Sequence, residues 1–494
     1  MNDREYKLFS AAPRIARSPV KIWKPLFNAC LAGMFALNIS ACTTLGTAEQ
    51  DKAAAKQEDS TKTTGAQDLE KLLNEETPAY EDLSETPTID PLTQLMGPQP
   101  LVTGSRAPEM EGEIVKIALL LPLSGTSEAI GRDLLKAANM ALFDLNNPQI
   151  RLIPVDTKGT PDGAEKAAAE ALVDGAELIL GPLFSTSVAP VRNLAAGRNV
   201  NLITFSTNVS VAGNGVYVMG LAVGQQIHRV MEFAYRQGLH KFAVLAPDSA
   251  YGDAVIDSVT KTETELGLLP DKMLRYPVNV APGTSELHDI AKILGDYAER
   301  HKRLQEEIGL YDSKDDSESK AYVKKLKKMD TFGDVSFDAL VLPEGGARLK
   351  ELAPLLSYYD IDPEKVKFIG TGLWDDPTLS AEPALIGGWY AAPSTKTARA
   401  FKERFKQTYG YQPARIASLA YDGMALAGLL ARGQKETRFS RQAIENPNGF
   451  TGYDGIFRFP PNGIAERGLA VIEVTAKGQK ELEPAPTSFA PLLN

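Results

Sequence analysis

The chain has 494 residues, 43% of them hydrophobic and 23% charged, so it is long enough to bury the cores of two or three domains. A formal net charge of -10, without any arginine-rich or aromatic-basic stretch, argues against nucleic acid as a partner. The two cysteines, Cys30 and Cys42, both lie near the amino terminus, and the four histidines lack the paired spacing of metal ligands, so no disulfide, metal or other cofactor is predicted.

The amino-terminal residues predict export. Basic residues precede an apolar run from Leu26 to Ile39, which is too short for a comfortable membrane span and is followed by small residues before Cys42. We expect residues 1–41 to be a signal peptide, with an uncleaved anchor as the alternative. The segment from Ile39 to Cys42 resembles the lipobox, in which Cys42 becomes the lipidated first residue. By resemblance to enterobacterial lipoproteins, Thr43 in place of an aspartate implies anchoring in the outer membrane, on the periplasmic face of the envelope.

Residues 42–113 have the composition of a tether. They are rich in Ala, Lys, Glu, Asp, Thr and Pro and contain few aromatic residues. Such a segment cannot bury enough apolar surface to offset the conformational entropy that ordering would cost. We expect a disordered acidic tether that holds the following domains away from the lipid.

From residue 114 on, short apolar runs alternate with helical patterns. Strands alternating with helices form βαβ units, so we predict an α/β fold of two doubly wound parallel-sheet lobes. The expected strands are Ile114–Pro122, Ile150–Asp156, Leu178–Pro182, Asn201–Phe205, Lys241–Pro247, Leu274–Val278, Ala339–Pro343 and Val366–Gly370, with a closing pair at Gly455–Phe459 and Gly468–Val474. The expected helices are 130–145, 162–174, 191–197, 225–237, 254–266, 396–408 and 416–432.

The same pattern predicts the domain boundaries. Residues 287–337 hold more helix than a minimal lobe needs, with a charged loop at 312–320, and we interpret them as an insertion that is either a solvated decoration or a partner-binding arm. Lobe 1 is placed at 114–220 and about 390–463, lobe 2 at 221–389 and about 464–480, and a tail at 481–494.

Four segments resemble the type 1 periplasmic binding proteins, the leucine-binding family. They are Lys116–Gly125, Leu180–Thr186, Leu202–Asn208 and Pro247–Gly252. The resemblance implies that the chain crosses three times between the lobes, near residues 215–223, 387–393 and 462–468. It also implies a ligand in the cleft, over which lobe 2 closes by hinge bending.

The same segments supply the predicted ligand site. Ligands of open parallel sheets bind beyond the carboxyl ends of the strands, where free N–H groups at helix starts can receive a carboxylate. The alternative is that the hydroxyl groups only cap helices. The first loop lacks the aromatic residue that amino-acid receptors of the family tend to carry. Glu128 in this loop could bind an ammonium group, with an exposed glutamate that contacts only water as the alternative. The predicted ligand-binding residues are Ser124, Ser185, Thr186, Ser206, Thr207, Asn208 and Tyr251.

Three later segments resemble the C-terminal domain of penicillin-binding protein activators, which are outer-membrane lipoproteins that stimulate peptidoglycan synthases. They are Ala353–Tyr359, Phe368–Asp375 and Ile464–Leu469. This resemblance implies a peptidoglycan synthase, a penicillin-binding protein, as the partner. The acidic tether stands where the best-known activators carry a helical-repeat domain, so no synthase-binding residue is assigned. Trp374 and Tyr358 are candidate contact aromatics, with core packing as the alternative.

Enzymatic motifs are not found. Ser317–Lys320 matches the S-x-x-K pattern of penicillin-binding enzymes, but a solvated loop lacks the rigid, desolvated setting that a serine nucleophile needs. We therefore predict a non-enzymatic envelope lipoprotein that regulates peptidoglycan synthesis. The alternative is the substrate receptor of a branched-chain-type amino-acid ABC transport system, which would deliver a small amino-acid-like ligand to an inner-membrane permease.

Overall fold

The structure is a computed structural model and describes residues 113–489. The predicted signal peptide, the lipidation site Cys42 and all of the tether except its last residue lie outside the described residues. Both predicted lobes lie inside them.

Lobe 1 is built on a five-stranded parallel sheet with the strand order β2-β1-β3-β4-β5. Its first elements are β1 (Val115–Leu121), α3 (Glu128–Leu145), β2 (Ile150–Asp156), α4 (Pro161–Val173), β3 (Leu178–Leu180), η1 (Ser185–Ser187), α5 (Val188–Ala196), β4 (Asn201–Thr204), η2 (Val209–Val211) and β5 (Val216–Val218). In β1, Ile117 and Leu119 share a core with α3, whereas Ala118 and Leu120 pack with α4 and α5. Helices cover both faces of the sheet, which explains why its central strands are nearly continuous apolar runs.

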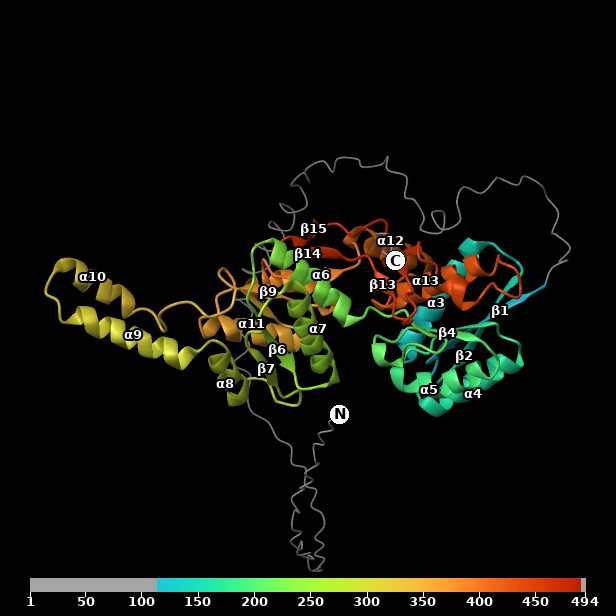
Figure 1. The fold of residues 1–494 in the computed structure, drawn as a ribbon, viewed down its shortest axis with the longest axis horizontal. Helices are drawn as coiled ribbons and strands as arrows, with labels where there is room; N and C mark the ends of the chain where they lie inside the picture. Colours follow the sequence, from blue (N-terminus) through green and yellow to red (C-terminus); the bar gives the residue numbers. More distant parts are fainter. Residues whose placement is uncertain (1–112, 490–494) are drawn as a thin grey trace, which may run out of the picture. The chain divides into compact units, whose positions relative to one another are not determined.

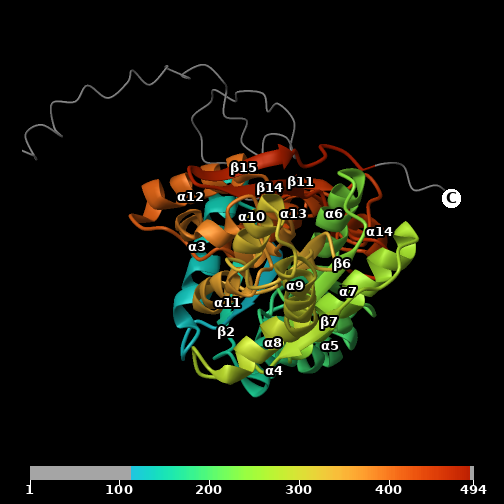
Figure 2. The same cartoon turned by 90° about the vertical axis from the view of Figure 1, so that its left-hand side faces the viewer.

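Lobe 2 is built on a seven-stranded sheet with the order β15-β14-β10-β9-β8-β6-β7. Its elements are α6 (Val223–Arg236), β6 (Phe242–Pro247), α7 (Ala250–Leu266), β7 (Met273–Tyr276), α8 (Ser285–Leu294), β8 (Ala339–Val341), α11 (Gly346–Tyr358), β9 (Lys367–Ile369), η3 (Gly372–Trp374), η4 (Pro377–Ala381), η5 (Pro383–Leu385), β10 (Trp389–Ala392), β14 (Ala470–Thr475) and β15 (Gly478–Glu483). Around β8, Leu340 and Leu342 pack toward α8 and α11, whereas Ala339 and Val341 pack toward α6 and α7. These four helices are labelled in Figure 2. Neighbouring strands in the order β7, β6, β8, β9 and β10 are parallel. The strand β14 pairs antiparallel with β10, and β15 pairs antiparallel with β14.

The chain passes between the lobes three times. The first passage leads from β5 to α6, the second from β10 to α12 (Thr395–Tyr409), and the third from β13 (Glu466–Arg467) to β14. Between the second and third passages, α12, α13 (Ala417–Leu430), α14 (Arg441–Ile444), β11 (Phe450–Gly452) and β12 (Gly455–Arg458) complete lobe 1. The predicted fold class, two α/β lobes with parallel sheets, is confirmed.

Three details differ from the prediction. The strands in segments 455–459 and 468–474 belong to different sheets: β12 pairs with β11 and β13, whereas β14 pairs with β10 and β15. The segments share one bond, from the Gly468 N–H to the Ile456 carbonyl (2.9 Å). The residues between them bind β5, where Val218 donates its N–H to the Gly463 carbonyl (2.7 Å) and accepts from the Ala465 N–H (2.9 Å). The expected tail from 481 begins inside β15, which folds back on β14 as an edge strand. The strand 389–392 belongs to lobe 2, so lobe 1 resumes only after it.

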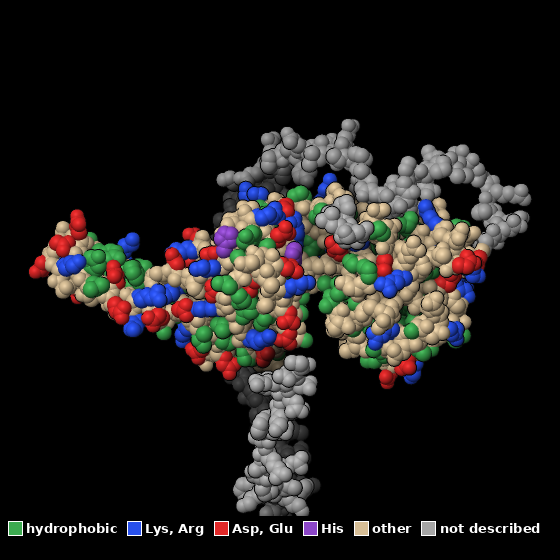
Figure 3. Space-filling view, in the orientation of Figure 1, with side chains coloured by type: hydrophobic (Ala, Val, Ile, Leu, Met, Phe, Trp, Pro, Cys, Tyr) green, Lys and Arg blue, Asp and Glu red, His purple; other side chains and the backbone are tan. Residues whose placement is uncertain are grey.

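The insertion is a helical hairpin that projects from α8 and is formed by α9 (Tyr297–Asp312) and α10 (Ser317–Leu326) (Figure 1). Acidic and basic side chains are interspersed over it (Figure 3). The predicted charged loop is shorter than 312–320, because Asp316 caps α10 by accepting the Ser319 N–H (2.7 Å). The S-x-x-K segment is thus the first turn of a helix, and its Lys320 pairs with Asp315 (3.2 Å). Within residues 113–489, none of the helices has the length and apolar character needed to span a membrane.

Candidate ligand site

The loop after β1 is closed by a carboxylate. The Ser124 hydroxyl donates to Asp156 Oδ2 (2.6 Å), and the N–H groups of Leu123 and Lys158 donate to Asp156 Oδ1 (2.8 Å each). Partial burial raises the pKa of Asp156, but these hydrogen bonds outweigh it and leave the pKa below its usual range. Ser124 lies at the predicted edge with its proton already engaged, so it offers a ligand only an acceptor.

Ser185 and Thr186 follow β3 with their hydroxyl groups unengaged. The chain turns off β3 at Gly181, whose φ of 93° and close approach to the Leu120 carbonyl leave no room for a Cβ atom. Ser185 is half-buried and Thr186 exposed, and no hydrogen bond of either hydroxyl is found in the described part of the chain. They stand at the start of η1, where backbone N–H groups favour negative charge.

Of the polar residues after β4, some cap the next helix and one is free to contact a ligand. The Ser206 hydroxyl accepts from the Asn208 N–H (3.1 Å), and Asn208 Oδ1 accepts from the Ser210 N–H (3.0 Å) to cap η2. The capping alternative therefore holds for Asn208. Thr207 is exposed, and among the described residues it has no hydrogen-bond partner, so its side chain is available.

In lobe 2, Tyr251 lies in the first turn of α7, and its hydroxyl is 2.9 Å from Thr371 Oγ1. Burial raises the pKa of Tyr251, although the bond to Thr371 lowers it, so the phenol stays protonated at neutral pH. Thr371 directly precedes η3, and the next N–H, of Gly372, donates to Gln226 Oε1 (2.5 Å). These bonds tie α6 and α7 to the carboxyl end of β9.

A second pair at this edge joins Tyr276 at the end of β7 to Glu344 beyond β8, with the phenol donating to Glu344 Oε2. Burial, and then the bond to this carboxylate, raise the pKa of Tyr276. Glu344 and Thr371 are not among the predicted ligand residues, although each follows a predicted strand as directly as Ser206 does. The rule of polar residues at strand ends identifies both once it is applied to lobe 2.

The remaining candidates have clear environments. Glu128 lies in the first turn of α3 and accepts from Arg132 Nε (2.6 Å), so its charge already has a cation. Trp374 is fully buried, and its Nε1 donates to the Leu342 carbonyl (3.2 Å), which is core packing. Tyr358, by contrast, is 71% exposed. Of the two candidate contact aromatics, only Tyr358 can reach a partner.

Sequence comparison finds a family likeness over part of the chain. Residues 114–292 match the family model described as periplasmic binding protein. The uncharacterized protein RP748 of Rickettsia prowazekii is 26% identical over 146 residues. That stretch is 29% of this chain and 38% of the relative, so the chain matches well under two thirds of the relative's length.

Structure comparison extends the likeness to both lobes. A putative branched-chain amino acid ABC transporter from Rhodospirillum rubrum is 17% identical, with a TM-score of 0.58 over 75% of this chain and 100% of that chain. The substrate-binding protein LivJ of Streptococcus pneumoniae, solved with isoleucine, is 16% identical, with a TM-score of 0.51 over 75% of this chain and 100% of that chain. The protein has the type 1 periplasmic-binding-protein fold, and its resemblance to that class is confirmed. The link to penicillin-binding protein activators stays a prediction.

Proposed function

We propose that this protein is a non-enzymatic binding protein of the cell envelope that holds a small carboxylate ligand, such as an amino acid, between its lobes. The match of residues 114–292 to the periplasmic binding proteins supports the class. The descriptions of the two solved structures support the role of substrate receptor for an ABC permease.

The main support for this proposal is the set of unengaged hydroxyl groups beyond the carboxyl ends of the lobe 1 strands. β3 and β4 are hydrogen-bonded neighbours, so Ser185 and Thr186 beyond β3 share an edge with Thr207 beyond β4. Hydroxyl and backbone N–H donors at one edge suit a carboxylate, because it accepts only. In lobe 2, Glu344 accepts from Tyr276 and from the Gly345 N–H (3.0 Å), and its carboxylate still has lone pairs for an ammonium group.

A melting-shift screen of the exported full-length chain against amino acids and other small carboxylates tests the proposal. A ligand at about a hundred times its Kd stabilises the folded state by roughly 2.7 kcal/mol. We expect Ser185→Ala to weaken binding about tenfold and Ser313→Ala, in the exposed turn after α9, to leave it unchanged. A screen without any shift at millimolar ligand would overturn the receptor function.

A second candidate function is regulation of peptidoglycan synthesis from a lipid anchor at Cys42, through contact with a penicillin-binding protein. The observation in its favour is Tyr358, which lies in a segment that resembles the activators and is exposed. Its ring is 5.0 Å from that of Tyr359, which in turn lies 5.2 Å from that of Tyr297. Tyr359 is buried and Tyr297 half-buried, so Tyr358 is the accessible ring of this cluster. Exposed tyrosines are enriched at protein interfaces.

Photocrosslinking tests this second function. We expect a crosslinker in place of Tyr358 to capture a purified penicillin-binding protein, and the same group in place of exposed Lys477 to capture none. Absence of the Tyr358 crosslink, together with synthase activity unchanged by the added protein, would count against regulation. Neither result affects the ligand screen.

A further inference from the structure

A cavity of about 760 Å³ lies at the amino ends of β3, β4 and β5, the edge of the lobe 1 sheet opposite to the predicted ligand site. Its other wall is formed by residues 435–445, which include α14, and by residues 461–463. We call it the amino-edge pocket. Its volume lies within the range of roughly 300–1,000 Å³ that is usual for small-molecule sites. None of the predicted ligand residues lines it.

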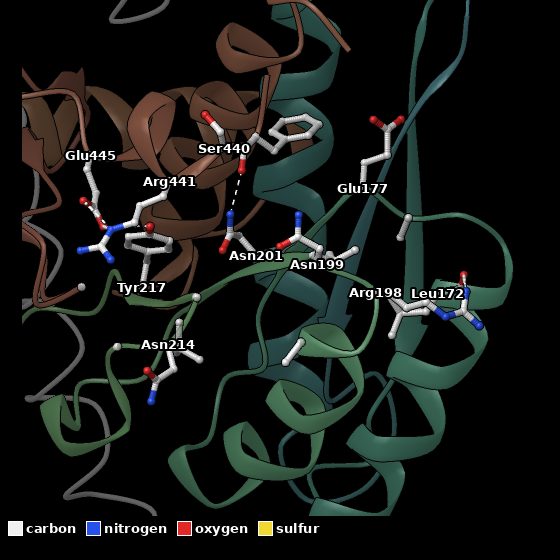
Figure 4. Close-up of a pocket in the computed structure, with 18 of the residues that line it drawn as sticks. Leu172, Glu177, Arg198, Asn199, Asn201, Asn214, Tyr217, Ser440, Arg441 and Glu445 are labelled. Atoms are coloured by element: carbon white, nitrogen blue, oxygen red, sulfur yellow. Dashed lines mark hydrogen bonds and ion pairs between the residues drawn. The ribbon is translucent and has the colours of Figure 1, made fainter. Parts of the chain in front are cut away.

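Three asparagine amides line one side of the amino-edge pocket (Figure 4). Asn199 and Asn214 have φ values of 54° and 53° in the turns before β4 and β5, and Asn201 is the first residue of β4. Within the described residues, the amides of Asn199 and Asn214 have no hydrogen-bond partner. Both side chains are exposed, so each amide has two donors and an acceptor free for a ligand.

The two walls are tied together by polar bonds. Asn201 Nδ2 donates to the Phe439 carbonyl (2.8 Å), which leaves its Oδ1 as an acceptor. On the same side, the Tyr217 hydroxyl donates to Glu445 Oε1 (3.0 Å), and Arg441 Nε lies 2.8 Å from that oxygen (Figure 4). These contacts join the two walls of the pocket and hold the side chains of Asn201, Tyr217 and Glu445 in place. The amides of Asn199 and Asn214 stay free to turn toward a ligand.

The charges of the lining cancel. Three acidic and three basic side chains line the pocket, namely Glu177, Glu436, Glu445, Arg198, Lys435 and Arg441. A net charge of zero gives no attraction for a strongly anionic or cationic ligand. Among the described lining residues, the unengaged side chains include the amides of Asn199 and Asn214, which combine donors with an acceptor, and the exposed carboxylate of Glu436, which only accepts. A hydroxyl group, itself donor and acceptor, can bond to both kinds of group.

We propose that the amino-edge pocket binds a neutral, polyhydroxylated ligand, a saccharide unit, which comes either from a glycan chain of the envelope or from a free sugar. Tyr217 and Phe439 are 3% and 8% exposed and offer no ring face for stacking, so binding rests on hydrogen bonds. The expected Kd for one sugar unit is therefore on the order of 1 mM, the weak end of specific binding.

The test titrates the exported full-length chain with saccharides and follows binding by saturation-transfer NMR. The probes are N-acetylglucosamine, its β-1,4-linked tetramer and glucose. The key variant is the double change Asn199→Gly with Asn214→Gly, because glycine adopts φ > 0 without strain and the backbone is kept while two amides are lost. Asn146→Gly is the matched control, since Asn146 also has a positive φ, 42°, but lies at the end of α3 outside the pocket lining.

We expect saturable saccharide binding that the double variant weakens at least tenfold and the control leaves unchanged. Tighter binding of the tetramer than of the monomer identifies a glycan chain as the source, and equal binding per site identifies a free sugar. No saturable signal with any probe at about 20 mM, or equal binding by the double variant, overturns the proposal. Ser185→Ala should not alter saccharide binding, which separates this pocket from the proposed ligand site.

Discussion

Glu263 on α7 is a buried carboxyl group with an unusual proton affinity. Its side chain is 1% exposed, and within residues 113–489 neither of its oxygens has a hydrogen-bond partner. Burial, and then the negative charge of Asp271, raise the pKa of Glu263 to about 7. An unfolded glutamate has a pKa of about 4.3, so between these values the folded chain keeps a proton that the unfolded chain releases. This group therefore favours folding fully below about pH 4, and the contribution is lost as the pH rises through 7.

Glu263→Gln removes this titration while keeping the size of the side chain. At pH 8 we expect the variant to be more stable than the unmodified chain by about 1 to 2 kcal/mol, because it no longer has to bury a charge or take up a proton. At pH 4.5 the two should be nearly equal. Urea unfolding at both pH values measures the difference, with the partly exposed Glu265→Gln on the same helix as the control. A difference that does not change with pH would contradict the argument.

At the scale of the element, the helix after the first strand of each lobe packs directly onto the end of that strand. Gly131 in the first turn of α3 lies against the Pro122 carbonyl, and Gly252 in the first turn of α7 lies against the Pro247 carbonyl. A Cβ atom at either glycine would overlap backbone that cannot move aside. The two lobes thus use the same contact to place the helix start beside their ligand-site loops.

Gly131→Ala and Gly252→Ala should each destabilise the protein by about 1 to 3 kcal/mol, since overpacking shifts the backbone. Gly309→Ala is the matched control, because Gly309 is a glycine of helix α9 with nothing within 4 Å of an added Cβ, and it should stabilise by up to about 1 kcal/mol. Thermal unfolding of the three variants measures these effects. Equal melting temperatures for all three would show that the helix starts can relax.

A buried arginine, Arg300, holds the helical hairpin of the insertion to the rest of lobe 2. Arg300 donates to the carbonyl groups of Gly333 (2.9 Å), Gly295 (3.2 Å) and Asp360 (3.2 Å). Arg300→Met leaves three acceptors without their donor, and we expect the hairpin to open more readily by roughly 2 kcal/mol. Hydrogen exchange of amides in 297–326 should then accelerate about 30-fold, a factor that follows from that free energy.

Exchange in β6 and β8 should stay unchanged in Arg300→Met, because the hairpin is a local unit outside the sheet. Arg303→Met, an exposed position on the same helix, is the control and should leave exchange in the hairpin as it is. Acceleration spread evenly over lobe 2 would mean instead that Arg300 stabilises the whole lobe.

At the scale of the whole molecule, the sequence predicts what depends on local pattern. Apolar runs such as 115–121 and 242–247 locate the buried strands because both faces of a parallel sheet are covered. The sequence does not predict β5, because its three residues follow Gly213 and Gly215 and form too short an apolar run. The candidate site is likewise only partly predictable. Polar residues at strand ends identify the sheet edge where the ligand is expected, but hydrogen-bond partners far away in the sequence are not predicted. The partner of Ser124 lies 32 residues away, and that of Tyr276 lies 68 residues away. Only the folded chain shows which hydroxyl groups remain unengaged.

Among residues 113–489, an ion pair joins the lobes outside the three passages of the chain. Arg415, just before α13 in lobe 1, has its Nε 2.7 Å from Asp375 Oδ2 in lobe 2 and its Nη1 3.4 Å from Asp454 Oδ1 in lobe 1. Asp375 directly follows η3, four residues after Thr371 of the proposed site. When the lobes close over a ligand by hinge bending, the distance between Arg415 and Asp375 is therefore expected to change.

Asp375→Asn removes the carboxylate that lobe 2 contributes to this pair. Arg415 keeps its partner Asp454, so it does not become a buried cation without a counter-charge. We expect the distribution of inter-lobe distances, measured between spin labels at Thr186→Cys and Asp248→Cys, to broaden because the preferred orientation loses an attraction between partly buried charges. Asp144→Asn is the control, since Asp144 pairs with Arg404 inside lobe 1 and its loss should alter stability without altering the distances. If the distribution is the same in all three proteins, the passages of the chain alone set the orientation, and Arg415 only stabilises the loop beside the proposed site.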